Sequence, residues 1–179
     1  TIYEGRVATE QLTEVEKVSI EGGEIKRYEE KEKTGRYAEF VYAPAEFAVT
    51  DPGSEDFAFN ILSKQTNINI QKSEININAF LRSHPSSNRW KVGFQREYGE
   101  AENGVIHGTD VLSDNEVGSI LEESRKNQIG LEYAYDDEHR IKLLLTQSGY
   151  IDIYQPSNYD SQDFVKYLRD EIVDYASSG

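Results

Sequence analysis

"HRIKLLLTQSGYIDIYQPSNYDSQDFVKYLRDEIVDY", residues 139–175, predicts a strand, a tight turn, a second strand and a helix. Aliphatic residues alternate with others on both sides of Ser148-Gly149, a pair typical of a two-residue hairpin turn. Apolar residues then recur at a spacing of three or four, which predicts a helix with one buried stripe. The predicted core residues are Ile141, Leu143, Leu145, Ile151, Ile153, Phe164, Leu168, Ile172 and Tyr175.

An earlier stretch, "GRYAEFVYAPAEFAVTDPGSEDFAFNILSKQ", has the same order of predicted elements over residues 35–65. Residues 36–52 align with residues 140–156 without a gap, and Phe57 then aligns with Phe164 after an insertion. Two interpretations stay open: a true internal duplication, or the chance similarity of any two strand–helix segments. In the first helix the predicted apolar stripe is Phe57, Ala58, Ile61 and Leu62.

Runs of strands followed by helices indicate an α+β fold with a mostly antiparallel sheet. If the two similar strand–turn–strand–helix units are copies, they form a pseudo-twofold tandem repeat. The predicted division has a first β-rich unit ending in a helix, a basic connecting segment with strands, and a second β-rich unit ending in the C-terminal helix. These segments are residues 1–66, 67–103 and 104–179, and we expect them to form one compact domain.

The N-terminal third predicts short strands. The first ends near Ala8, and residues 15–20 and 24–29 form a hairpin around Gly22-Gly23. The charged stretch "YEEKEKTG", residues 28–35, is typical of an exposed hairpin end.

In the middle of the chain, "NINIQKSEINI" alternates isoleucine with polar residues over residues 67–77 and predicts a half-buried strand. "RWKVGFQREY" predicts another strand, in which Arg89 and Lys91 share an exposed face and Trp90 faces the core. Further on, Ser113 and Glu116 have the spacing of a helix-capping box.

The composition limits the classes of function. Thirty-three acidic and 19 basic side chains give a net charge of −14, which opposes non-specific binding to polyanions and is typical of a salt-adapted protein. The lack of cysteine excludes disulfides, thiolate metal sites and cysteine nucleophiles. Without a long apolar run or a basic-then-apolar leader, the sequence predicts a cytoplasmic protein that has no membrane partner.

Few residues indicate chemistry. The sequence contains no phosphate-binding loop, dinucleotide fingerprint or nucleophile elbow, and its three histidines lack metal-ligand spacing. We therefore predict no catalytic residue, metal or cofactor. The acidic "DDEHR", residues 136–140, is interpreted as a polar hairpin tip, and a hydrolase with a scattered acidic site is the last of three functional alternatives.

The distribution of charge is uneven. Residues 57–96 carry a net charge of +5, because Glu74 is their only acid, whereas the remainder carries −19. Basic residues among aromatics suit a protein partner or a second copy of the chain, which is the first functional alternative, and also a nucleic acid, which is the second. A third explanation is that burial alone excludes acids from this stretch. The predicted binding residues within segment 64–96 are Lys72, Arg82, His84, Arg89, Lys91 and Arg96.

Overall fold

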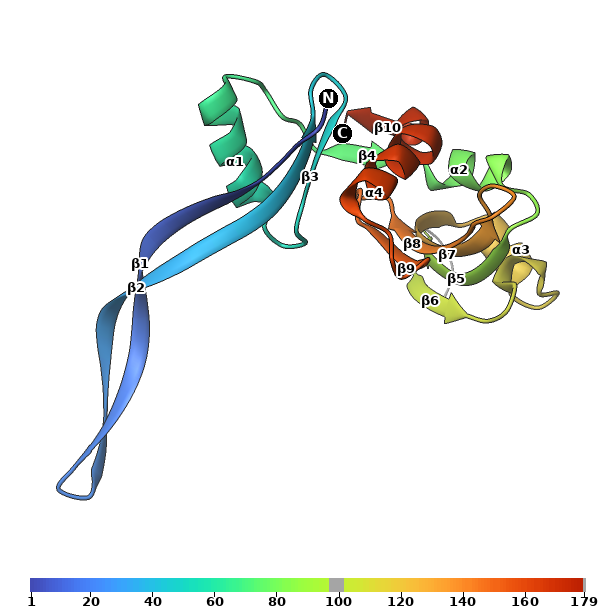
Figure 1. Cartoon of the computed structure of the whole chain (residues 1–179). Coiled ribbons are helices and arrows are strands. Elements are labelled where there is room, and N and C mark those ends of the chain that lie inside the picture. Colours follow the sequence, from blue (N-terminus) through green and yellow to red (C-terminus); the bar gives the residue numbers. More distant parts are fainter. Residues whose placement is uncertain (97–101, 179) are drawn as a thin grey trace. The chain divides into compact units, whose positions relative to one another are not determined.

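The computed structural model describes residues 1–96 and 102–178 (Figure 1). The chain divides into two compact units, Thr1–Ile70 and Gln71–Gly179. The sequence also predicts a turn at residues 99–103, and this turn lies mostly outside the described residues. Among the helices that the structure describes, none has the length and apolar character needed to cross a membrane.

Unit 1 is built on a long antiparallel ribbon of two strands, β1 (Tyr3–Glu21) and β2 (Glu24–Ala43). Gly22 and Gly23 connect the strands with φ values of +61° and +84°, the left-handed conformation that a tight hairpin turn requires. The ladder is continuous, so the prediction of separate short strands is wrong. Residues 28–35 are exposed as predicted, but they lie within β2 and not at a hairpin end.

The base of the ribbon carries the core of unit 1. β3 (Phe47–Thr50) pairs with the end of β2, and α1 (Glu55–Thr66) packs beside them. The buried residues of this small core are Val7, Ala38, Ala58 and Leu62. Ile61 is only partly buried, so the buried stripe of α1 is narrower than the sequence predicts.

Unit 2 contains a five-stranded sheet in the order β6-β5-β7-β8-β9, in which all neighbours are antiparallel. One face is apolar because aliphatic residues alternate along the strands, as residues 139–155 predict. The mixed, mostly antiparallel α+β class is therefore confirmed. The strands are β5 (Asn88–Gln95), β6 (Asn103–His107), β7 (Arg125–Ala134), β8 (Arg140–Thr146) and β9 (Ile151–Gln155).

Helices cover the apolar face of this sheet. The C-terminal helix α4 (Ser161–Tyr167) continues as a π-helical turn, η2 (Leu168–Ile172), and a 3-10 turn, η3 (Val173–Tyr175). Buried Leu168 and Ile172 confirm part of the predicted stripe, whereas Phe164 is only half-buried. The remaining elements are α2 (Ile77–Ser83), η1 (Val111–Ser113), α3 (Gly118–Glu122), and the paired strands β4 (Ser73–Ile75) and β10 (Ala176–Ser178).

Two local predictions fail because polar side chains bind the backbone. The strand predicted over residues 67–77 is reduced to β4, since Asn76 Oδ1 accepts a hydrogen bond from the Ala79 amide at 3.0 Å and starts α2. Ser113 does not cap a helix. Asp114 accepts from the amides that follow it, and α3 begins only at Gly118.

The internal repeat is not confirmed. Residues 36–66 and 140–167 both run strand, strand, helix, but their hairpins differ in register. In the first, Val41 pairs with Val49. The aligned residues of the second do not pair with each other, because Leu145 pairs with Ile151.

Candidate functional site

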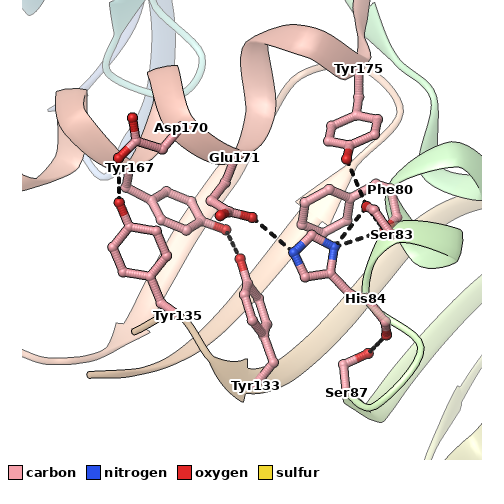
Figure 2. A network of polar contacts seen from close by, with 10 residues as sticks. All are labelled: Phe80, Ser83, His84, Ser87, Tyr133, Tyr135, Tyr167, Asp170, Glu171 and Tyr175. Atoms are coloured by element: carbon pink, nitrogen blue, oxygen red, sulfur yellow. Dashed lines mark hydrogen bonds and ion pairs between the residues drawn. The ribbon is translucent and has the colours of Figure 1, made fainter. Parts of the chain in front are cut away.

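The most connected polar cluster of unit 2 surrounds His84, which follows the last turn of α2 (Figure 2). Its Nδ1 lies 2.9 Å from the Phe80 carbonyl oxygen, and its Nε2 lies 2.8 Å from Glu171 Oε2 on η2. A carbonyl and a carboxylate only accept hydrogen bonds, so both contacts are hydrogen bonds when the ring carries a proton on each nitrogen. The geometry therefore fits an imidazolium that connects α2 to the C-terminal helix.

The titration of His84 agrees with this assignment. Burial by itself lowers the pKa of His84, but the hydrogen bonds to Glu171 and to the Phe80 carbonyl outweigh burial and leave the pKa above its ordinary value. The Phe80 and Tyr133 rings lie on the imidazole with centroid distances of 4.4 Å each. The cluster is thus packed as well as paired.

Ser83 lies beside His84, with its hydroxyl oxygen 3.0 Å from His84 Nδ1. Its hydroxyl donates to the Phe80 carbonyl at 2.8 Å and accepts a hydrogen bond from the Tyr175 hydroxyl at 2.7 Å. Attack by a serine requires a base that accepts its proton, and His84 Nδ1 can accept it only when it carries no proton itself. In its imidazolium form, His84 is a structural connection and not a base.

Two tyrosine contacts extend the cluster. The hydroxyls of Tyr133 and Tyr167 are 2.7 Å apart inside the core, and the Tyr135 hydroxyl donates to Asp170 at 2.7 Å. Burial raises the pKa of both Tyr133 and Tyr167 well above the ordinary tyrosine range. Both hydroxyls stay neutral at physiological pH, and neither is an activated acid.

The other predicted binding residues differ in their partners and exposure. Arg89 donates to the Pro85 carbonyl at 2.7 Å and lies 3.8 Å from Asp110. Arg96 lies 3.6 Å from Glu123. The remaining three are Arg82 and Lys72, which are exposed, and Lys91, which is half-buried.

A β-bulge separates Arg89 from Lys91. Arg89 pairs with buried Leu131, but Lys91 pairs with Gly130, so Trp90 is an extra residue. Trp90 and Lys91 both lie over Gly130, because a methyl group there would come within 2.6 Å of the indole and 2.8 Å of the lysine Cβ. The prediction that Arg89 and Lys91 share a face, with Trp90 in the core, is therefore wrong.

The bulge places Trp90 on the second face of the sheet, opposite the helices. Lys142 Nζ lies 5.4 Å from the centroid of the indole, and the Tyr154 ring meets it edge-on at 5.8 Å. His107 on β6 lies 6.5 Å from it. We call these four residues the indole cluster. Lys142, Tyr154 and His107 were not predicted as site residues, although alternation along β8 assigns Lys142 to the face opposite Leu143.

A polar cavity of about 510 Å³ opens elsewhere on unit 2. It is lined mainly by amide and hydroxyl side chains, with Glu74 and Arg125 4.0 Å apart at its edge. Asn127 Oδ1 is buried there without a hydrogen-bond partner among the described residues. In residues 1–96 and 102–178, no three histidine or acidic side chains are grouped as a metal site would require.

The ribbon of unit 1 is the other unusual surface. The register pairs even-numbered residues of β1 with odd-numbered residues of β2, so these share one face. Large apolar side chains are exposed on this face, and Ile20 and Ile25 stand opposite each other with 75% and 70% of their surface exposed. We call this face the apolar ribbon face; its residues are Leu12, Val18, Ile20, Ile25 and Tyr37.

Comparison of the chain with protein-family models, with curated proteins and with solved structures gives no match. The function is therefore inferred from the geometry of the chain itself.

Proposed function

We propose that this chain is a non-catalytic interaction or assembly module that binds a protein partner or a second copy of itself. The observation that supports this proposal is the ribbon. Within residues 1–70, β1 and β2 pair only with each other from Thr9 to Gly35, and the small core lies at their base.

A two-stranded ribbon is marginally stable in water, because it has no third strand and no covered face. Here cross-strand ion pairs such as Arg6–Glu39 at 2.6 Å and Glu10–Lys33 at 3.3 Å hold the strands together. Such exposed pairs each contribute less than about 1 kcal/mol. A partner that covers the apolar ribbon face would supply the missing burial.

The charge of the ribbon favours a protein partner over a polyanion. Residues 3–43 contain ten acids and seven bases, a net charge of −3. Glu21 and Glu24 flank the turn and face each other at the tip. Phosphate groups would meet repulsion there.

Light scattering of the full chain at two concentrations and two salt levels tests the proposal, together with affinity capture of partners. Ile20→Ser with Ile25→Ser should weaken association about tenfold or more without unfolding, because both side chains are exposed. Ile68→Ser is the matched control, since Ile68 is also exposed (43%) but lies outside the ribbon. Equal association of all three proteins would contradict the proposal.

A nucleic acid is the second candidate ligand, and the indole cluster is the observation that favours it. Stacking on Trp90 or Tyr154 beside Lys142 and Lys91 would suit a single strand. Oligonucleotide binding should quench the fluorescence of Trp90, the single tryptophan, and should weaken steeply with salt. Lys91→Glu with Lys142→Glu should abolish it, whereas Arg82→Glu on α2 is the control.

The basic segment 64–96 remains a proposed docking surface for either partner. Its described cations lie on different elements, since Lys64 is on α1 of unit 1 and Arg82 is on α2 of unit 2. Lys91 is the residue through which we propose that it acts.

A further inference from the structure

The outer edge of β1 has a sequence that suits one antiparallel pairing with a second copy of itself. β1 lies at the end of the three-stranded sheet β1-β2-β3, so within residues 1–70 no strand pairs with its outer edge. The amide and carbonyl groups of such an edge can bind another strand. The outer edge of β2 is similarly open over residues 24–38, before β3 and Asp51 contact it.

Twofold symmetry restricts how two identical edges can pair. The axis that relates two antiparallel neighbouring strands stands normal to the sheet, and it keeps every side chain on its own face. Residues that oppose each other point to the same face, so their numbers must add to an even sum. Every allowed register is therefore centred on one residue, which opposes its own copy.

Charge then selects among the registers of β1. Centres from residue 9 to residue 15 keep at least 13 of the 19 residues of each strand paired. Six of these seven centres place a glutamate directly opposite a glutamate, for example Glu10 opposite Glu14 when Leu12 is central. Only the register centred on Gln11 avoids this, and it pairs residues 3–19.

The register centred on Gln11 also makes favourable pairs. Arg6 lies opposite Glu16 of the second copy, and symmetry makes this ion pair twice. Val7 opposes Val15, a β-branched pair that stabilises neighbouring strands. The remaining opposed pairs are Thr9 with Thr13, Ala8 with Glu14, Glu10 with Leu12, Gly5 with Lys17, Glu4 with Val18, and Tyr3 with Ser19.

The edge of β2 differs. Centres from residue 29 to residue 33 keep at least 11 of its 15 open residues paired, and each opposes like charges. Lys31 opposes itself in the central register, and Glu30 then opposes Glu32. Like charges on an exposed edge are a common defence against unwanted pairing. One edge of the ribbon is thus protected, and the other is not.

We propose that two copies of the chain associate through β1, antiparallel, with Gln11 on the twofold axis. This inference rests on the proposed assembly function and names its partner. The product is a four-stranded sheet in the order β2-β1-β1-β2, which gives the ribbon the extra strands that it lacks. The apolar ribbon faces of both copies then lie on the same side of the sheet.

Site-specific cross-linking of the full chain tests the register. The sequence contains no cysteine, so one engineered thiol reports one position. Gln11→Cys should give a covalent dimer with a short bismaleimide. Thr34→Cys is the matched control, because Thr34 opposes Gln11 within the same ribbon but lies on the protected edge. Equal cross-linking of the two variants would overturn the proposal.

A pair of charge variants gives an independent test by sedimentation. Ala8 is exposed and opposes Glu14 of the second copy, so Ala8→Lys should tighten dimerisation and Ala8→Glu should weaken it. Because each change acts twice, we expect dissociation constants that differ by about tenfold or more. Identical constants would overturn the register even if both proteins fold.

The outcomes separate this inference from the proposed function. A chain that associates through Ile20 and Ile25 but does not cross-link at Gln11 retains the assembly function and overturns the β1 pairing. A chain that is monomeric at every concentration also overturns the pairing, and the proposed function then stands only if the serine variants weaken the capture of a different protein. The proposed function itself is overturned only if Ile20→Ser with Ile25→Ser weakens neither self-association nor the binding of another protein.

Discussion

The largest differences between the sequence-based predictions and the structure concern single residues. His84 is predicted as a binding residue, and the structure places it between α2 and η2, where it contacts the Phe80 carbonyl and Glu171. Neither Glu171 nor the Phe80 carbonyl is identifiable as its partner from sequence, because Glu171 is 87 residues away and the acidic chain offers many carboxylates. An ion pair between residues that are far apart in the sequence can be located only once the fold is known.

The His84 connection should depend on pH. Its pKa is raised in the folded state, so its stabilising effect is fully present below the unfolded pKa, about 6.5, and is lost as pH rises through the folded pKa. His84→Gln should therefore reduce the free energy of unfolding more at about pH 5.5 than at about pH 9. Urea denaturation at both values measures this. An equal loss at both would contradict the imidazolium assignment, and His139→Gln at the exposed hairpin tip is the control.

Trp90 shows that one extra residue in a strand changes the face to which a side chain is assigned by alternation. Simple alternation assigns Trp90 to the core, but the bulge moves it to the opposite face over Gly130. Gly130 interrupts the apolar alternation of residues 129–133, and such a glycine indicates that another group approaches the strand closely.

Gly130→Ala should displace the indole, because the added methyl group would meet it at 2.6 Å. The emission of Trp90 should shift to longer wavelength as the ring moves into water, and Lys142 should lose its contact. Gly35→Ala is the control, since nothing lies within 4 Å of its added methyl group. Unchanged emission in Gly130→Ala would mean that the ring does not pack there.

At the scale of elements, prediction succeeded over β8 and its turn, where apolar alternation is clean, and failed in the ribbon, where charge is dense. β8, its turn and α4 follow from aliphatic spacing alone. β1 and β2 carry charges on both faces, so their sequence predicts only short strands. Their length comes from a ladder whose ion pairs form across strands, such as Lys31–Glu14, and such pairs are visible only once the register is known.

The two helices of the proposed repeat should differ in their response to truncation. Leu168 is 3% exposed, so Leu168→Ala should cost roughly 2–5 kcal/mol of unfolding free energy. Ile61 is the residue that aligns with Leu168, but it is only partly buried, so Ile61→Ala should cost less. Chemical denaturation of both variants checks this. Equal losses would favour equivalent positions, as a repeat requires.

At the scale of the whole molecule, the sequence predicted the class of fold but not the division of the chain into two units. The mixed antiparallel class follows from strand runs and helical stripes. The boundary at Ile70 does not, because the alternating isoleucines of residues 67–77 indicate a strand that Asn76 interrupts. The repeat stays a prediction, since the matching order of elements lacks a matching register.

The net charge of the whole chain should make its thermal stability depend on salt concentration. Unit 1 has eight bases and fourteen acids, a charge of −6, and unit 2 has eleven and nineteen, a charge of −8. Self-repulsion of like charges destabilises the compact state, and salt screens it. The exposed ion pairs of the ribbon act in the opposite direction, but each contributes less than about 1 kcal/mol.

The melting temperature should therefore rise between low and molar sodium chloride at neutral pH, as expected for a salt-adapted protein. The rise should largely disappear near pH 4.6, the isoelectric point, because the net charge that salt screens is then absent. Thermal melts followed by circular dichroism at both pH values measure the effect, and sucrose controls for non-ionic stabilisation. If the melting temperature is unchanged or lower in molar salt at neutral pH, the ion pairs outweigh the net charge and salt adaptation is refuted.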